Sequence, residues 1–167
     1  MQRTLSRSLF VFALVAGAAF VALTANALPS LVATHFAASG LANGFMERPN
    51  YLAFMLIFIT GFPALVVTSM SAVYRGSGER MNLPNGDWWL APQRRDATVA
   101  FLVAHAQWLG VLLVVFLCLV HRQLLQANTV QPPRLSGSML IATVGPFVLM
   151  MALWFAALVL RLRRPRA

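Results

Sequence analysis

Four apolar stretches without a charged side chain limit what this chain can fold into. They cover residues 9–28, 51–74, 101–120 and 138–160. A helix of about 20 residues, rising about 1.5 Å per residue, crosses a hydrocarbon core of about 30 Å. Backbone groups inside hydrocarbon have no water to bond, so each stretch must be helical. The sequence therefore predicts an integral membrane protein with transmembrane helices over 9–28, 51–74, 99–120 and 138–160.

The predicted fold class is an all-α, four-helix membrane bundle that occupies residues 1–167 as a single domain. Because 59% of the residues are hydrophobic and 10% are charged, no soluble domain fits beside four spans. An outer loop is expected over 29–50, an inner loop over 75–98 and a second outer loop over 121–137. The first outer loop is long enough for a short helix and a turn, with Asn43-Gly44 and Pro49 as the residues that break regular structure. Small residues on the first helix favour close helix packing and leave a homodimer open; they are Ala13, Gly17, Ala18 and Ala22.

The basic residues predict the orientation of the bundle. All thirteen are arginine, and the cytoplasmic loops of membrane proteins carry an excess of basic residues. Both termini are therefore expected in the cytoplasm, which leaves only Arg48, Arg122 and Arg134 outside. The ten arginines expected inside are Arg3, Arg7, Arg75, Arg80, Arg94, Arg95, Arg161, Arg163, Arg164 and Arg166. The net charge of +9 thus indicates the lipid bilayer as the partner, rather than nucleic acid.

The first apolar stretch allows two interpretations. Arg3 and Arg7, the apolar run and the triplet Ala25-Asn26-Ala27 together resemble a signal peptide with a cleavage site. The run is at or beyond the upper length of an ordinary signal core, so we expect it to stay attached as the first transmembrane helix. In either case the chain from residue 28 onward begins outside.

Activities found among small four-helix membrane proteins need residues that this sequence lacks or scatters. A disulfide oxidase needs paired thiols, whereas Cys118 is alone, and a proton-coupled exporter needs an acid within a span, whereas all four acids lie in loops. A haem held by two histidines needs them on facing helices, and three of the spans contain none. His35, His121 and Glu47 share the outer face without the spacing of zinc ligands. We therefore expect no metal, no cofactor and no catalytic residue.

His105 is the one ionisable side chain expected inside a span, close to Gln107 in the third helix. A titratable group within the membrane is a functional hypothesis by default. The favoured interpretation is a neutral histidine that forms a hydrogen bond with a neighbouring helix, because no span offers an acidic partner. The alternative is a small transporter or membrane enzyme that uses His105 or His35.

The inner loop combines turn residues with aromatic and basic ones. Paired tryptophans beside a membrane usually lie in the headgroup region, and arginines there pair with lipid phosphate or with an acidic partner. Asp96 is placed to cap the third helix. The residues expected to interact on the cytoplasmic side are Pro84, Asn85, Trp88, Trp89, Arg94 and Arg95.

Residues 28–48 resemble the first-loop signature of the SdpI-like family, whose domain has no assigned function. The signature runs from Leu-Pro through a histidine with an aromatic neighbour to glycines, a second aromatic and a basic residue. Its matching positions here are Leu28, Pro29, His35, Phe36, Gly40, Asn43, Gly44, Phe45 and Arg48. The sequence departs from the signature at Ala37, Ala42 and Arg48, where the family commonly has Asn, Pro and Lys. Residues 82–98 are similar to a segment of a short bacterial subset of such proteins.

The resemblance implies a small, non-enzymatic protein of the bacterial inner membrane. The best-known relative is an immunity protein that protects against a membrane-active toxin and sequesters a repressor, so a peptide toxin or a protein partner is expected. The expected recognition loop comprises His35, Phe36, Gly40, Asn43, Gly44 and Arg48. An accessory subunit of a larger membrane complex is the alternative, and it would copurify with fixed partners.

Overall fold

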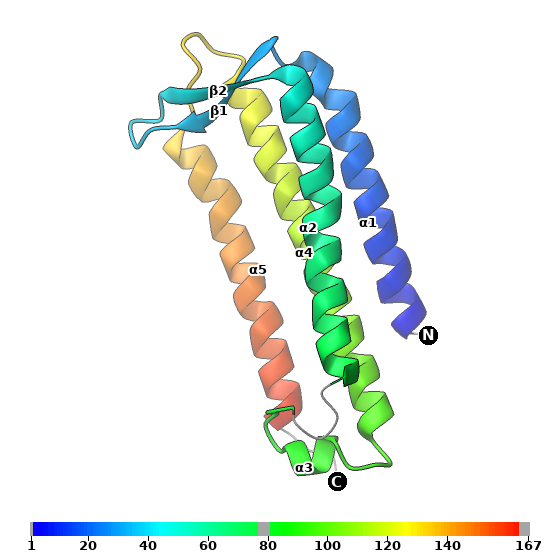
Figure 1. Ribbon diagram of the computed structural model, residues 1–167. Coiled ribbons are helices and arrows are strands. Elements are labelled where there is room, and N and C mark those ends of the chain that lie inside the picture. The colour runs from blue at the N-terminus through cyan, green and yellow to red at the C-terminus, as the bar shows by residue number, and fades with distance from the viewer. Residues whose placement is uncertain (1, 77–80, 164–167) are drawn as a thin grey trace.

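Four long helices make up most of the computed structural model, which describes residues 2–76 and 81–163 (Figure 1). They are α1 (Gln2–Thr24), α2 (Arg48–Gly76), α4 (Arg95–Ala127) and α5 (Gly137–Arg163). Each is long and apolar enough to cross a membrane, which confirms the four predicted spans as helices. Three of the arginines used to predict orientation lie outside the described residues, namely Arg80, Arg164 and Arg166.

The helix α4 lies at the centre of the packing. α1 and α2 pack against α4 and against each other, whereas α5 packs chiefly against α4 and lies to one side (Figure 1). Gly17 and Gly110 are located where these helices approach most closely, because a Cβ at either position would meet a neighbouring side chain within 3 Å. The buried core runs between α1, α2 and α4 and includes Val21, Ile59 and Val114.

The first outer loop is not the predicted short helix and turn. It continues α1 through a short 3₁₀ turn, η1 (Ala25–Ala27), into an antiparallel hairpin of β1 (Leu31–Phe36) and β2 (Ala42–Glu47). The bundle therefore carries a small β element, and the fold is not purely α-helical. Val32 and Thr34 are β-branched and Phe36 is aromatic, and these three residues at alternate positions of β1 favour the strand conformation. We call this end of the molecule the hairpin end, and the opposite end, where α1 begins and α5 ends, the terminal end (Figure 1).

The turn of the hairpin also differs from the prediction. Asn43 and Gly44 lie within β2, and the chain reverses over residues 37–40 instead. Gly40 has a φ of +82°, which glycine adopts without strain, and its N–H donates to the carbonyl of Ala37 at 2.8 Å. Gly40 therefore has a conformational role in the turn, which lies before the predicted pair Asn43-Gly44.

The third predicted helix is longer at both ends in the structure. α4 begins at Arg95, four residues before the predicted start, and ends at Ala127, seven residues beyond the predicted end. Asp96 lies in the first turn of the helix rather than at the capping position, which Arg94 occupies. An acid there still complements the positive end of the helix dipole. The extension at the other end places His121 inside the bundle instead of in a loop.

Candidate binding sites at the two ends of the bundle

The hairpin is fixed to α4 by a buried amide. Asn128 follows the last residue of α4, and its side chain accepts the N–H of Ala33 at 2.9 Å and donates to the carbonyl of Ala33 at 3.1 Å. Ala33 is fully buried and Asn128 is 8% exposed, so without this side chain the N–H and carbonyl of Ala33 would be buried without these partners. The side chain thus acts as a short additional strand along the edge of β1.

The predicted recognition residue Arg48 holds the start of the hairpin. Its guanidinium donates to the carbonyl of Leu28 at 3.1 Å and to that of Asn26 at 3.4 Å, at the exit from α1. These carbonyls belong to the segment that leaves a helix end, where backbone acceptors lack helical partners. The structure therefore gives Arg48 a role in joining α1, the hairpin and α2.

The tip of the hairpin is held by the segment that precedes α5. The carbonyl of Gly40 accepts the N–H of Leu135 at 2.8 Å, and the N–H of Ala42 donates to the carbonyl of Pro133 at 3.1 Å. Leu41 and Arg134 form an antiparallel bridge between the two segments. A side chain at Gly40 would collide with the carbonyl oxygen of Leu135. The hairpin is consequently anchored at its base, its edge and its tip.

Several side chains of the anchored hairpin remain open to the surroundings. Leu31 is 55% exposed and Phe45 is 51% exposed. His35 is exposed as well; its ring lies close over Gly44, and its Nδ1 is 3.2 Å from the hydroxyl of Thr34. Asn43 is exposed and Phe36 is half-buried. The predicted loop residues therefore form an ordered surface, although Gly40 and Arg48 belong to its support.

His121 was predicted in the second outer loop, but it lies on the buried face of α4. It is fully buried, and its Nδ1 lies 2.6 Å from the hydroxyl of Tyr51 while its Nε2 lies 2.9 Å from the hydroxyl of Thr24. Thr24 already donates its hydrogen to the carbonyl of Phe20, so Nε2 is the donor in that contact and Nδ1 accepts from Tyr51. The signal was available: His121 follows Val114 and Leu117 on the buried face of α4 at helical spacing.

The hydrogen bond between Tyr51 and His121 gives a first testable prediction. Tyr51→Phe leaves Nδ1 without a donor in a site that excludes water, so we expect a loss of about 1–3 kcal/mol in the free energy of unfolding. Thermal unfolding in detergent micelles, followed by circular dichroism, measures this loss. Tyr74→Phe is the matched control, since the Tyr74 hydroxyl has no hydrogen bond among the described residues. Equal losses in both variants would contradict the role of His121.

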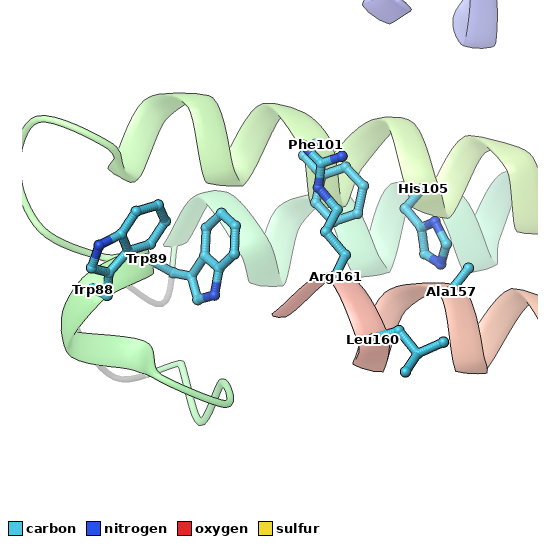
Figure 2. A pocket seen from close by; sticks show the side chains of 7 residues that line it. All are labelled: Trp88, Trp89, Phe101, His105, Ala157, Leu160 and Arg161. Atoms are coloured by element: carbon cyan, nitrogen blue, oxygen red, sulfur yellow. The ribbon is translucent and has the colours of Figure 1, made fainter. Parts of the chain in front are cut away.

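The terminal end contains a cavity of about 720 Å³ between three elements (Figure 2). The short helix α3 (Gly86–Trp89) lies at one end of the cavity, α4 forms one wall and α5 forms the other. The guanidinium of Arg161 lies over the ring of Phe101, at 4.1 Å from its centre. We call this space the terminal-end cavity; its lining residues are Trp88, Trp89, Phe101, His105, Ala157, Leu160 and Arg161.

The inner loop is attached to α5 by its predicted residues. Trp89 Nε1 donates to the carbonyl of Leu162 at 2.7 Å, and Asn85 Nδ2 donates to the same carbonyl at 3.2 Å. Both bonds satisfy an acceptor at the C-terminal end of α5, which has no helical partner. The two tryptophans lie edge to face, with 4.6 Å between ring centres. The tryptophan pair therefore serves a structural contact in addition to any role at the headgroup region.

The remaining inner-loop residues differ in how far they are engaged. Arg94 stacks on Trp88 at 4.1 Å and donates Nε–H to its carbonyl at 2.7 Å. Arg95 points elsewhere, toward the carbonyl of Arg75 at 3.5 Å and toward Asp96 at 3.9 Å. Pro84 is exposed. The structure thus unites Asn85, both tryptophans and Arg94, and separates Arg95 from them.

His105 and Gln107 do not form one site. His105 Nε2 donates to the carbonyl of Trp154 at 3.1 Å, Trp154 Nε1 donates to the carbonyl of His105 at 3.0 Å, and the two rings stack at 4.5 Å. Gln107 accepts a hydrogen bond from Ser6 of α1 at 2.7 Å instead. One residue therefore joins α4 to α5 and the other joins α4 to α1.

No group of three or more potential metal-ligating side chains occurs in ranges 2–76 and 81–163, and His35, His121 and Glu47 do not come together as a zinc site. Comparison with protein-family models, curated proteins and solved structures gives no significant match. The residues at the two ends of the bundle are therefore the basis for inferring function.

Proposed function

We propose that this chain is a non-enzymatic, multi-pass protein of the bacterial inner membrane that binds a peptide or protein partner through its hairpin. An immunity or signalling protein of the SdpI-like kind fits this description. The observation that carries the proposal is the hairpin itself: it is anchored at three places and yet leaves Leu31 and Phe45 more than half exposed. Apolar side chains displayed on an ordered support are typical of interaction surfaces.

The anchoring contacts of the hairpin support a role in binding, because they order the surface before a partner docks. A surface that is already ordered loses little conformational freedom when a partner docks, so more of the contact free energy remains as affinity. Asn128 and Arg48 order the hairpin through hydrogen bonds to backbone groups, so the exposed side chains remain available to a partner. A partner that fits has apolar anchors for Leu31 and Phe45 and polar groups for His35 and Asn43.

The proposed orientation places the hairpin outside the cytoplasm. Arg48, Arg122 and Arg134 are the arginines at the hairpin end, whereas the described arginines of the terminal end are Arg3, Arg7, Arg75, Arg94, Arg95, Arg161 and Arg163. The excess of basic residues at the terminal end supports a cytoplasmic location for that end. The partner would then arrive from the extracytoplasmic side.

The contacts of His105 favour a structural role over the transporter or enzyme alternative. Its Nε2–H and the indole N–H of Trp154 each bond the other residue's backbone carbonyl, which uses the imidazole donor to hold two helices together. A proton carrier would need a partner able to exchange protons with the ring, and a backbone carbonyl cannot.

Photo-cross-linking in living cells tests the proposed function. A photoreactive amino acid at position 45 is expected to give a discrete peptide or protein adduct. The matched control is the same probe at position 54, since Phe54 on α2 is 52% exposed and Phe45 is 51% exposed. Only lipid adducts are expected there. Lipid adducts alone at both positions would show that the hairpin lies in the membrane surface and would overturn the proposal.

The same assay gives a quantitative prediction for Leu31. Burying a leucine side chain is worth about 1.5–3 kcal/mol, so Leu31→Ser should reduce the adduct from position 45 by about tenfold or more. Leu65→Ser is the control, because Leu65 is 65% exposed but lies on α2 away from the hairpin. An adduct yield that is insensitive to Leu31→Ser would mean that the partner does not contact this surface.

A further inference from the structure

We propose that the terminal-end cavity binds one anionic phospholipid, with its phosphate on Arg161 and an acyl chain against the apolar walls. This site lies at the opposite end of the bundle from the hairpin, so the inference does not depend on the proposed function.

The walls require an apolar occupant. Phe101, Ala157 and Leu160 face the space between α4 and α5 (Figure 2). A cavity of about 720 Å³ that opens beside transmembrane helices lies within reach of lipid chains, which fill it at no loss of dispersion contacts. Water in the same space would find few polar partners.

The rim requires an anionic group. Arg161 is exposed and forms no ion pair with any carboxylate in the described part of the chain. Its stacking on Phe101 fixes the guanidinium in place while its N–H groups remain available. A guanidinium can donate two parallel hydrogen bonds to a phosphate, which makes this anion a close geometric match.

The position of Arg161 matches the depth of a lipid headgroup. It lies in the last turn of α5, directly after the apolar stretch, and Figure 2 shows it between the pair Trp88 and Trp89 on one side and His105 on the other. Tryptophan and arginine are the residues that occupy the boundary between hydrocarbon and headgroups.

A second, smaller cavity shares part of its lining with the first. It measures about 290 Å³ and shares Phe101, His105 and Arg161 with the terminal-end cavity, while Leu5, Ala104 and Trp108 complete its lining. Arg161 therefore lines two apolar spaces. A phospholipid fits this arrangement because the glycerol that bears its one phosphate also bears two acyl chains.

Native mass spectrometry of the full chain in detergent tests the proposal. Phosphatidylglycerol and phosphatidylcholine with identical acyl chains serve as probes at equal concentration. We expect preferential retention of phosphatidylglycerol, and we expect Arg161→Gln to reduce that retention about tenfold. Arg163→Gln is the matched control, because Arg163 lies in the same helical turn and lines neither cavity. Its effect on retention should be less than twofold.

A second variant tests the cavity separately from the charge. Ala157→Phe fills the space between α4 and α5 and leaves Arg161 in place, so it should also reduce phosphatidylglycerol retention. Equal retention of the two lipids by the unmodified chain, or equal losses in Arg161→Gln and Arg163→Gln, would overturn the proposal in favour of general charge attraction. Displacement of the lipid by the same concentration of inorganic phosphate would assign the site to a free anion instead.

Discussion

Gly110→Val is expected to destabilise the bundle by about 3 kcal/mol, because it inserts a branched side chain where three helices meet. A Cβ at Gly110 of α4 would lie 2.5 Å from Cε2 of Phe10 in α1 and 2.6 Å from Cγ2 of Val67 in α2. Phe10 and Val67 are themselves buried, and neither an aromatic ring nor a β-branched side chain can withdraw easily. The helices must separate to accommodate the change. Thermal unfolding in detergent, followed by circular dichroism, measures the loss.

Gly61→Val is the control for the conformational effect of valine in a helix. Gly61 lies within α2, and a Cβ there would meet nothing within 4 Å. Its replacement should change the free energy of unfolding by less than about 1 kcal/mol, the range of ordinary helix propensities. Equal losses for the two glycines would show that the close approach at Gly110 does not control stability.

The membrane-spanning helices could be predicted because their signal is long and local. Any stretch of about 20 uncharged residues has few ways to satisfy its backbone in hydrocarbon, so charge and length suffice. The ends of α4 could not be predicted in the same way. Its last two turns contain His121 and Arg122, polar residues that the hydropathy pattern treats as loop. Contacts from other helices stabilise this extension, since Tyr51 and Thr24 form hydrogen bonds with the His121 ring.

The hairpin was missed because its turn is set by distant residues. Asn43-Gly44 is a strong local turn signal, but the chain turns over residues 37–40, where Gly40 bonds to Leu135. Local preference is outweighed here by contacts that span nearly a hundred positions in the sequence. The same holds for Asn128, whose pairing with Ala33 no motif indicates.

The sequence indicated several residues of the candidate sites, but it did not indicate what each residue does there. His35, Gly40, Gly44 and Arg48 were grouped by a resemblance, and the structure places the first three in the hairpin and Arg48 at the start of α2, directly after it. Their division into exposed and supporting residues required the backbone geometry. Of the residues that line the terminal-end cavity, the sequence singled out Trp88, Trp89 and His105. Phe101, Leu160 and Arg161 belong to helices that were predicted without their packing partners, so the cavity itself was not predicted.

Gly40→Val is expected to release the tip of the hairpin and abolish partner binding, while the bundle stays folded. A β-branched residue at a φ of +82° is strained by about 1–3 kcal/mol, and its side chain would displace the carbonyl of Leu135. Hydrogen exchange should therefore accelerate across residues 31–47 and remain slow in α2 and α4. The adduct from a photoreactive probe at position 45 should disappear.

Two companion variants decide what kind of surface the hairpin is. Gly137→Val is the control for the backbone change, because a Cβ at Gly137 meets nothing within 4 Å, and it should leave the adduct unchanged. His35→Gln keeps hydrogen-bonding capacity without imidazole acid–base chemistry, so a recognition surface should tolerate it with less than a threefold loss of adduct. If His35→Gln abolishes the adduct while Gly40→Val leaves it unchanged, the hairpin is not a recognition surface. Chemistry at the imidazole would then outweigh the order of the hairpin, and binding alone would not account for the protein's role.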